Sequence, residues 1–244
     1  MFKWFGLFPI VVLLNGCSAN KEIANELNQS LAPAKQYSQD ALSVEEITKL
    51  KPQISPPIKV AITQPGNSRY SSNEWSSMEL QEIESWQSSL KSSGFASELV
   101  IIPSSLGSSC VRTWKNDCDT QAYRLAAARL HADAVLVIER AEKIDSYLNP
   151  LSILNITVVG MWVIPAHHRD SYSLYQAYLV DTANGYIYGT ARAEGMANSV
   201  RPFMYTNDKS VASEASLKGL KALGKKINEI ALQAMVKSSP RRMR

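Results

Sequence analysis

Ala134-Val-Leu-Val-Ile138 is a continuous apolar run, typical of a strand that is covered on both faces. Upstream of it, Ile58–Thr63 alternates like a strand, and residues 99–102 form a second short apolar run. Apolar residues at helical spacing separate these runs, over 75–90 and over 123–130. Strand, helix, strand, helix, strand is the order of parallel βαβ crossovers, so the first half of the chain predicts a parallel sheet.

The second half of the chain predicts antiparallel strands instead. Residues 153–164 are apolar and β-branched, and residues 172–180 form the next strand-like run. Between these two runs, His167-His168-Arg169-Asp170 predicts a turn. Asn184-Gly185 is a strong signal for a two-residue hairpin, after which residues 186–193 return as another strand.

An amphipathic helix over about 211–237 ends the predicted domain. We therefore expect one α/β domain over residues 58–237. Its mixed sheet should lie in three layers and consist of an N-terminal βαβαβ unit, an antiparallel β-meander and a long C-terminal helix. A domain of about 180 residues buries roughly 70 % of the surface that its unfolded chain exposes, which allows a sizeable core.

The N-terminus has the pattern of a secretory signal. Lys3 precedes an apolar stretch from Trp4 to Leu14. This stretch is well short of the roughly 20 residues that a spanning helix needs, and Pro9 would weaken a permanent membrane helix. We expect residues 1–16 to be removed as a signal peptide.

Leu14-Asn15-Gly16-Cys17 resembles the lipobox of bacterial lipoproteins. The resemblance implies that a diacylglycerol is attached to the sulfur of Cys17, that the signal is cut before it, and that the new amine receives an acyl chain such as palmitate. Asn15 departs from the residue type usual at its position, and an inert, buried cysteine is the alternative. Ser18 in place of Asp favours the outer membrane by resemblance to enterobacterial sorting, with the inner membrane as the alternative.

Polar segments flank the predicted domain. Residues 17–57 are rich in Asn, Gln, Ser, Ala and Lys and predict a tether, in which Ser43 and Glu46 have the spacing of a capping box. Residues 238–244 form a basic tail. Removing Lys3 and the basic residues from position 237 onward takes the net charge from +4 to −1. The body of the protein therefore lacks the electrostatic footprint of a nucleic-acid-binding protein.

Two further cysteines, Cys110 and Cys118, lie close together in the sequence. In an oxidising compartment, with Cys17 lipidated, an even pair favours a disulfide. Its short loop would stabilise the fold by roughly 2.5 kcal/mol. Free thiols are the second interpretation and a metal site the third, although no His lies in the loop and the spacing matches no common zinc pattern.

The sequence contains no assembled catalytic motif. It has no Gly-x-Ser-x-Gly elbow, no phosphate-binding Gly-rich loop and no His-Glu-x-x-His pattern. The pair His167-His168, with Asp170 nearby, could form a surface metal site, but a solvent-exposed hairpin is the favoured interpretation. Several acidic residues are expected at strand ends, where they serve either as catalytic carboxylates or as ordinary turn residues: Glu139, Asp145, Asp181 and Glu194. Trp114 and Tyr147 are expected in loops, as exposed interaction residues or as residues buried under a loop.

Two family resemblances follow from the predicted strands. The order of elements over about 58–237 resembles the domain of TolB-like and curli-secretion (CsgG-like) envelope proteins. Four local segments, at 100–106, 133–138, 151–165 and 181–185, come in an order similar to that of the rhombotarget lipoproteins. The second resemblance implies a small envelope lipoprotein of unknown activity that is associated with rhomboid-type proteases. This chain departs from the pattern after residue 235, because no apolar segment follows there.

Together these observations predict a non-enzymatic, lipid-anchored lipoprotein of the cell envelope that faces the periplasm and binds another envelope component. We expect no cofactor, no metal and no nucleic acid. One alternative is a lipoprotein that binds a small ligand, which needs an apolar pocket of several hundred Å3. Another is a hydrolase that uses the strand-end carboxylates with His167 and His168.

Overall fold

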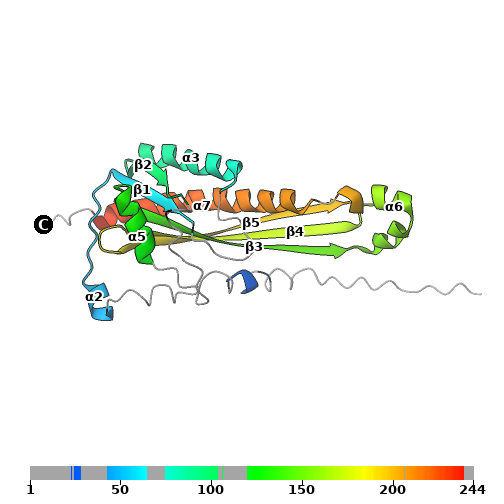
Figure 1. Ribbon diagram of the computed structural model, residues 1–244, viewed down its shortest axis with the longest axis horizontal. Coiled ribbons are helices and arrows are strands. Elements are labelled where there is room, and N and C mark those ends of the chain that lie inside the picture. The colour runs from blue at the N-terminus through cyan, green and yellow to red at the C-terminus, as the bar shows by residue number, and fades with distance from the viewer. Residues whose placement is uncertain are drawn as a thin grey trace, which may run out of the picture.

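The apolar run at residues 134–138 begins the central strand of a five-stranded mixed sheet (Figure 1). The computed structural model describes residues 23, 25–28, 43–64, 75–103, 106, 120–205 and 207–238. The strands in their order across the sheet are β2 (Ala96–Ile101), β1 (Ile58–Thr63), β3 (Ala134–Leu148), β4 (His167–Asp181) and β5 (Ile187–Arg201). β1 pairs in parallel with β2 and β3, whereas β3, β4 and β5 are antiparallel. The predicted mixed α/β fold is confirmed.

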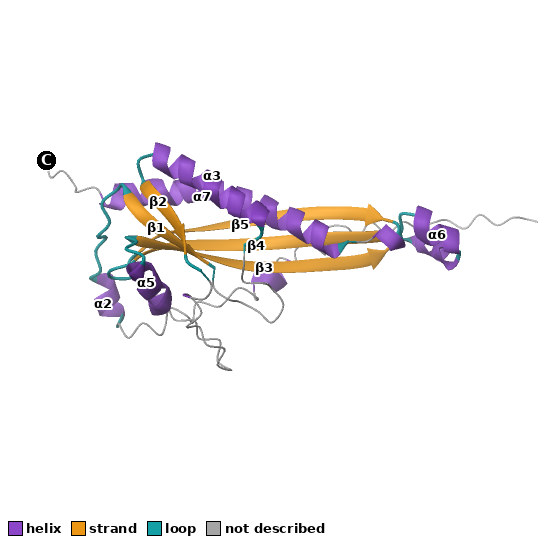
Figure 2. Ribbon diagram, turned by 45° about the horizontal axis from the view of Figure 1, so that its top comes forward, coloured by secondary structure: helices purple, strands orange, loops and turns teal. Residues whose placement is uncertain are grey.

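The antiparallel strands are much longer than the parallel ones. β1 and β2 have 6 residues each, and β3, β4 and β5 have 15 each. At about 3.3 Å per residue, the three long strands form a ribbon of roughly 50 Å. This ribbon extends from the end of the molecule that holds β1 and β2 to the opposite end, which carries α6 (Figure 2). The sequence predicted only the first five residues of β3, because the rest of the strand is polar on its exposed side.

Helices cover both faces of the sheet where the five strands lie together. The elements are α3 (Ser77–Ser92) and α7 (Asp208–Ser238) on one face and α5 (Thr120–Arg129) on the other. The first face buries Ile62, Trp86 and Leu220 in one core, and the second buries Tyr123 and Val135 in another. Because successive residues of a strand point to opposite faces, the uninterrupted apolar run of β3 contributes to both cores.

Small residues on β5 allow α7 to lie close to the sheet. Ala191, Ala193, Gly195 and Ala197 face the helix in succession. A Cβ atom added at Gly195 would lie 2.0 Å from the carbonyl oxygen of Ala215, so the two backbones touch at this point. The alternation of these residues therefore fixes both the face and the distance at which α7 packs.

The prediction of a strand over 153–164 is wrong. The segment folds as a 3-10 helix, η2 (Pro150–Ile156), followed by a short helix, α6 (Val158–Val163). Asn149 caps η2, since its side chain accepts a hydrogen bond from the N–H of Leu151. Thr157 caps α6 in the same way through the N–H of Gly160. These local caps outweigh the β-propensity of the branched side chains between them.

The turn predicted at residues 167–170 is also wrong, because these residues begin β4 and pair with both neighbouring strands. The hairpin at Asn184-Gly185 is confirmed, but its loop is longer than two residues. The N–H of Asp181 donates to the carbonyl of Tyr186, which leaves residues 182–185 as a four-residue loop. Gly185 has φ +79°, a conformation that glycine adopts readily.

The segment before β1 already contacts the domain. The short helix α2 (Val44–Thr48) begins with the predicted capping box of Ser43 and Glu46. Further on, Ile54 is buried in the core beneath α3 and α7. The domain boundary at residue 57 stays a prediction, but the ordered contacts begin before it. Within the described part of the chain, we find no helix with the length and apolar character needed to cross a membrane.

Candidate functional site

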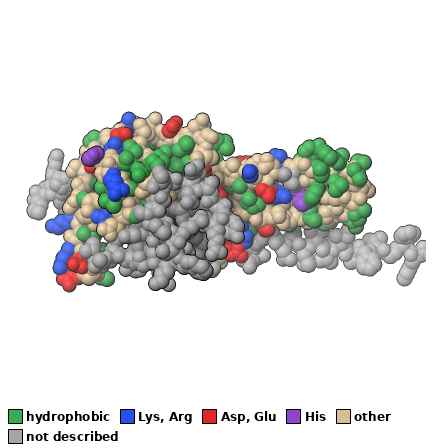
Figure 3. Space-filling model, in the orientation of Figure 1, with side chains coloured by type: hydrophobic (Ala, Val, Ile, Leu, Met, Phe, Trp, Pro, Cys, Tyr) green, Lys and Arg blue, Asp and Glu red, His purple; other side chains and the backbone are tan. Residues whose placement is uncertain are grey.

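A cluster of exposed apolar side chains occupies the far end of the ribbon. We call it the apolar tip and define it as η2, α6 and the 3-10 turn η3 (Phe203–Tyr205). Ile156 is 85 % exposed and Val159 is 71 % exposed. The other large apolar side chains exposed here are Leu151, Ile153, Leu154, Val158, Trp162, Val163, Phe203, Met204 and Tyr205. Figure 3 shows these side chains gathered at the end of the molecule that carries α6.

The tip is locally ordered despite its exposure. η2 and α6 lie so close that a Cβ added at Gly160 would be 2.0 Å from the carbonyl oxygen of Leu154. The hydroxyl of Thr157 donates to that same carbonyl and accepts from the N–H of Gly160. Trp162 contacts the ring of Tyr205 edge to face at 5.7 Å, which joins α6 to η3. The apolar side chains are therefore presented by a defined structure.

Exposed apolar residues are common singly, but a contiguous patch on a monomer usually marks an interaction site. In the tip, η2, α6 and η3 together form such a patch. The tip is therefore the strongest candidate site among the described residues. Sequence reasoning missed it because an apolar, β-branched segment looks the same in a buried strand as at an exposed tip. Two helix-start signals in the sequence could have revealed the tip. They are Asn149 followed by Pro150, and Thr157, which lies seven residues after Pro150 inside the predicted strand.

The two adjacent histidines do not form a shared site. His167 lies against Phe203, with ring centroids 5.0 Å apart, on the face that α7 covers. His168 stacks on Tyr147 at 5.0 Å on the opposite face. The expectation that Tyr147 lies in a loop is wrong, because Tyr147 belongs to β3. No group of three or more His, Cys, Asp or Glu among the residues described could hold a metal ion.

The four acidic residues predicted at strand ends are dispersed. Only Asp181 lies at a strand end, where its side chain accepts hydrogen bonds from Tyr188 and from the hairpin loop. Asp145 lies opposite Asp170 in the strand register. Asp170 precedes Asp181 by eleven residues in β4, so Asp145 is about 36 Å from Asp181. Glu194 is exposed beside Arg192 within β5. The expectation of strand-end carboxylates is wrong for Glu139, Asp145 and Glu194. Of these, only Asp145 lies near a histidine, because its partner Asp170 is two residues from His168 on the same face of the sheet.

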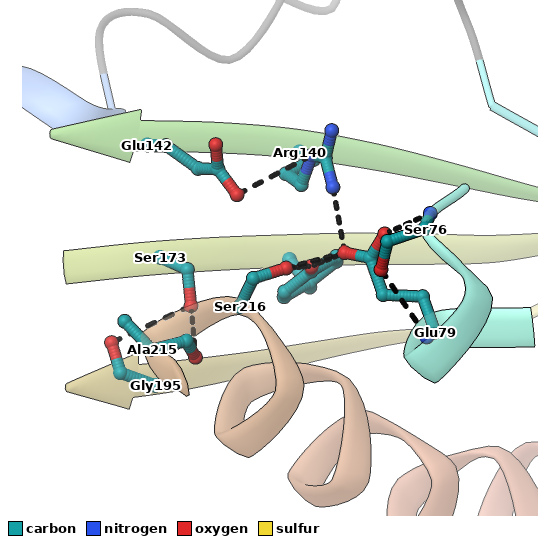
Figure 4. A network of polar contacts seen from close by, with 9 residues as sticks. Ser76, Glu79, Arg140, Glu142, Ser173, Gly195, Ala215 and Ser216 are labelled. Carbon is teal, nitrogen blue, oxygen red and sulfur yellow. Dashed lines mark hydrogen bonds and ion pairs between the residues drawn. The ribbon is translucent and has the colours of Figure 1, made fainter. Parts of the chain in front are cut away.

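A buried polar network joins α3, α7 and the sheet (Figure 4). The guanidinium of Arg140 donates to Glu79 Oε1 at 2.7 Å, and the hydroxyl of Tyr175 donates to the same oxygen at 3.3 Å. The hydroxyl of Ser216 also contacts Glu79 and lies 2.6 Å from Tyr175 Oη. The N–H of Ser76 donates to the second carboxylate oxygen of Glu79 at 2.8 Å. Each side chain comes from a different element, so the network fixes the helices on the sheet.

The protonation states in this network follow from its contacts. Burial alone would raise the pKa of Glu79, but the hydrogen bonds from Ser216 and Ser76, with the charge of Arg140, hold that pKa below its usual value. Burial raises the pKa of Glu142, and the nearby Arg140 opposes the shift. Burial also raises the pKa of Tyr175. Glu79 is 4 % exposed and closed off from solvent, so this charge pair serves packing and is not positioned to meet a substrate.

Glu139 yields a prediction about pH and stability. It is 3 % exposed, accepts from Tyr178 Oη at 3.2 Å, and its Oε2 atom finds no hydrogen-bond partner within the described part of the protein. Burial raises the pKa of Glu139, against the opposing effect of the Tyr178 hydrogen bond. The pKa of Glu139 is therefore higher in the folded state than in the unfolded state, where it is near 4.5. Ionisation of Glu139 thus destabilises the fold at pH values above 4.5.

Glu139→Gln should therefore increase the free energy of unfolding at pH 7 by about 1 kcal/mol. The gain should disappear at pH 4, where the wild-type carboxyl binds a proton in the folded state. Urea unfolding at both pH values measures the difference, and the exposed Glu194→Gln is the matched control. A loss of stability at pH 7 would contradict the account of Glu139 as an uncompensated buried carboxylate.

A groove of about 430 Å3 lies along β4 and β5 in the middle of the ribbon. Its lining residues are Leu27, Tyr172, Ser173, Leu174, Glu194, Gly195 and Met196. Leu27 belongs to the short stretch that includes residues 25–28, and it is buried with Ala141 and Leu174 against the sheet. The groove is mainly apolar, with Glu194 as its charged residue. The three cysteines, the basic tail from residue 239 onward and Trp114 lie outside the described residues.

The sequence matches no protein-family profile and no curated protein. Among solved structures, protein XCC0632 from Xanthomonas campestris has 11 % identity and a TM-score of 0.37, over 79 % of this chain and 93 % of that one. Lipoprotein GNA1162 from Neisseria meningitidis has 13 % identity and a TM-score of 0.31, over 72 % and 99 %. A minor lipoprotein from Acinetobacter baumannii has 8 % identity and a TM-score of 0.35, over 75 % and 98 %.

Proposed function

We propose that this protein is a lipid-anchored lipoprotein of the cell envelope that acts by binding and not by catalysis. The observation that carries the proposal is the apolar tip, an ordered and exposed patch at the end of a long ribbon. The arrangement of the His and acidic residues supports a binding role, because Glu139, Asp181 and Glu194 lie far along the ribbon from His167 and His168, and the two histidines face opposite sides of the sheet.

The lipobox at Cys17 supports a location in the envelope. We propose that the signal over residues 1–16 is removed, that Cys17 carries the lipid, and that the domain faces the periplasm from the outer membrane. The disulfide between Cys110 and Cys118 and the resemblance to the rhombotarget lipoproteins belong to this proposal as predictions. The envelope component that the protein binds would contact the tip.

Cys17→Ser tests the anchor. We expect the wild-type protein to stay with the membrane fraction after an alkaline carbonate wash, which removes peripherally bound proteins. The variant, expressed behind a signal that is cleaved independently of lipidation, should move to the soluble fraction, because it lacks the acyl chains that give stable anchoring. Cys110→Ser is the matched control, since it replaces another cysteine of the same chain and should stay membrane-bound. A Cys17→Ser variant that resists the wash as well as the wild type would refute the lipid anchor.

The groove along β4 and β5 supports a second candidate function. Its volume of about 430 Å3 lies within the range of small-molecule sites, and its apolar lining suits an apolar ligand. A lipoprotein that carries such a ligand should retain it through purification, and native mass spectrometry would detect the added mass. Protein that is free of any bound molecule, and that binds no apolar dye in the groove, would favour the tip as the functional surface.

A further inference from the structure

We infer that the apolar tip inserts into the bilayer that holds the lipid on Cys17, so that the protein contacts this membrane at two points. The inference rests on the proposed function, because it names the partner of the tip as the acyl region of the membrane. Its first support is charge. No Asp, Glu, Lys or Arg occurs between Asp145 and Arg169, a stretch that includes all of η2 and α6. Surface segments of soluble proteins normally carry charges.

The polar groups of the tip are largely satisfied within it. The side-chain oxygen of Asn149 accepts from the N–H of Leu151, and its amide group donates to the carbonyl of Pro165. Thr157 uses its hydroxyl both as donor and as acceptor within the tip. In hydrocarbon, an unpaired backbone or side-chain polar group costs several kcal/mol, so a segment can enter only if it pairs these groups internally. Asn149 and Thr157 meet this requirement within the tip, whereas the buried side-chain oxygen of Asn155 in η2 has no partner among the described residues.

The size of the tip fits insertion into one leaflet. α6 has 6 residues, which is about 9 Å of helix, compared with a hydrocarbon core of about 30 Å. Trp162, Phe203 and Tyr205 lie beside the aliphatic residues, and aromatic rings of this kind are enriched at the membrane interface. Charged side chains return where the tip joins the ribbon: Arg169, which is ion-paired with Asp208, and the exposed Arg201. This arrangement is that of an interfacial segment.

The reach of the chain favours the membrane as the occupant over a separate protein. Ile23 is buried with Ala141 and Leu174 on the ribbon. Ala141 is seven residues before Leu148, the last residue of β3, which places Ala141 about 23 Å from that end of the strand. Cys17 precedes Ile23 by six residues, which can span at most about 20 Å. Fully extended toward the tip, Cys17 would stop about 3 Å short of the level of Leu148, so its acyl chains can reach a bilayer surface at the base of the tip.

Tryptophan quenching by brominated lipid tests this inference. The lipidated full-length protein is reconstituted into vesicles of phosphatidylethanolamine and phosphatidylglycerol, with ordinary or with brominated acyl chains. Bromine quenches tryptophan within the acyl region, so Trp162 should lose emission in the brominated vesicles. In a Trp114→Phe background, Trp162→Phe should abolish this loss, because the two remaining tryptophans, Trp75 and Trp86, lie on the part of the sheet that holds β1 and β2.

Charged substitutions supply the second arm of the test. Ile156→Asp/Val159→Asp should lower the inserted fraction about tenfold or more, because it returns two apolar side chains to water and places charges where hydrocarbon would be. The matched control is Leu232→Asp/Val236→Asp, which makes the same change at exposed positions near the other end of α7. The control should leave the quenching unchanged. All four positions are exposed, so the folded state should survive, as circular dichroism would verify.

Each outcome decides the inference. Quenching that depends on Trp162 and is lost in the tip variant supports it. Protein that floats with the vesicles but is not quenched overturns it while leaving the anchor and the proposed function standing. If Ile156→Cys is then also protected from a membrane-impermeant maleimide, a second copy of the chain covers the tip instead. Wild-type protein that does not float contradicts both the anchor and the tip insertion.

Discussion

Arg140→Leu should lower the free energy of unfolding by about 3–5 kcal/mol, because it leaves a buried carboxylate without its charge partner. The side chains of Arg140 and Glu79 are only 7 % and 5 % exposed, and their atoms are 2.7 Å apart. Ser76, Tyr175 and Ser216 would still donate hydrogen bonds to Glu79, but they carry no charge to compensate its ionised form. Urea unfolding followed by circular dichroism measures the loss.

The double variant Glu79→Leu/Arg140→Leu separates the two costs. It removes both charges, so it should be considerably more stable than Arg140→Leu alone, although Glu142 then loses the opposite charge of Arg140. The effect of Arg140→Leu should also depend on pH. The lowered pKa of Glu79 means that its contribution to stability is present above the unfolded-state value near 4.5 and is lost as the pH falls through the folded-state pKa. A cost below about 1 kcal/mol at pH 7 would show that the pair behaves like an exposed one.

Gly195→Ala should be the second large effect, with a loss of about 3 kcal/mol in the free energy of unfolding. The added Cβ would lie 2.0 Å from the carbonyl oxygen of Ala215 and 2.3 Å from the backbone nitrogen of Gly219. Backbone atoms in the middle of a helix cannot move away singly. The substitution must therefore push α7 off β5, and thermal unfolding should detect it as a lower midpoint.

Gly189→Ala is the matched control for this substitution. Gly189 lies on the same strand and also faces α7, but the atoms nearest to its added Cβ are side-chain atoms of Ile230 at 3.1 Å and Gln233 at 3.3 Å. These side chains can shift by a few tenths of an ångström, so we expect a change within about 1 kcal/mol. Equal effects at the two glycines would mean that α7 does not approach β5 as closely as the structure indicates.

The buried half of the fold could be predicted from local sequence patterns. The apolar run at 134–138, the helical spacing before 90 and the hairpin glycine Gly185 each depend on neighbours in the chain, and each was confirmed. The lengths of the long strands could not be predicted in this way. Their outer halves are held by cross-strand pairing and by α7, and on β5 the buried positions carry small residues in place of the large apolar ones that signal a strand.

The sequence did not reveal the apolar tip or the buried polar network, and the reason differs between the two. The tip was read as a strand because hydrophobicity is normally a sign of burial, and here the apolar residues are exposed. The network was missed because Glu79 and Arg140 are 61 residues apart, and only the packing of α3 on the sheet brings them together. A single sequence reports periodicity within an element, but it does not report which charged residues of different elements meet.

α7 follows all five strands in the sequence, which has a consequence for the order of folding. β4 and β5 are joined by a short loop and can pair as soon as both have emerged, because closing a short loop costs little entropy. β1 must wait for β3, which follows it by about 70 residues and separates it from β4 in the sheet. Tyr175, Tyr188 and the other residues of the larger core stay uncovered until α7 arrives. A chain that is threaded through a membrane from its N-terminus would thus remain without a closed core until α7 has crossed, which keeps it in the extended state that translocation requires.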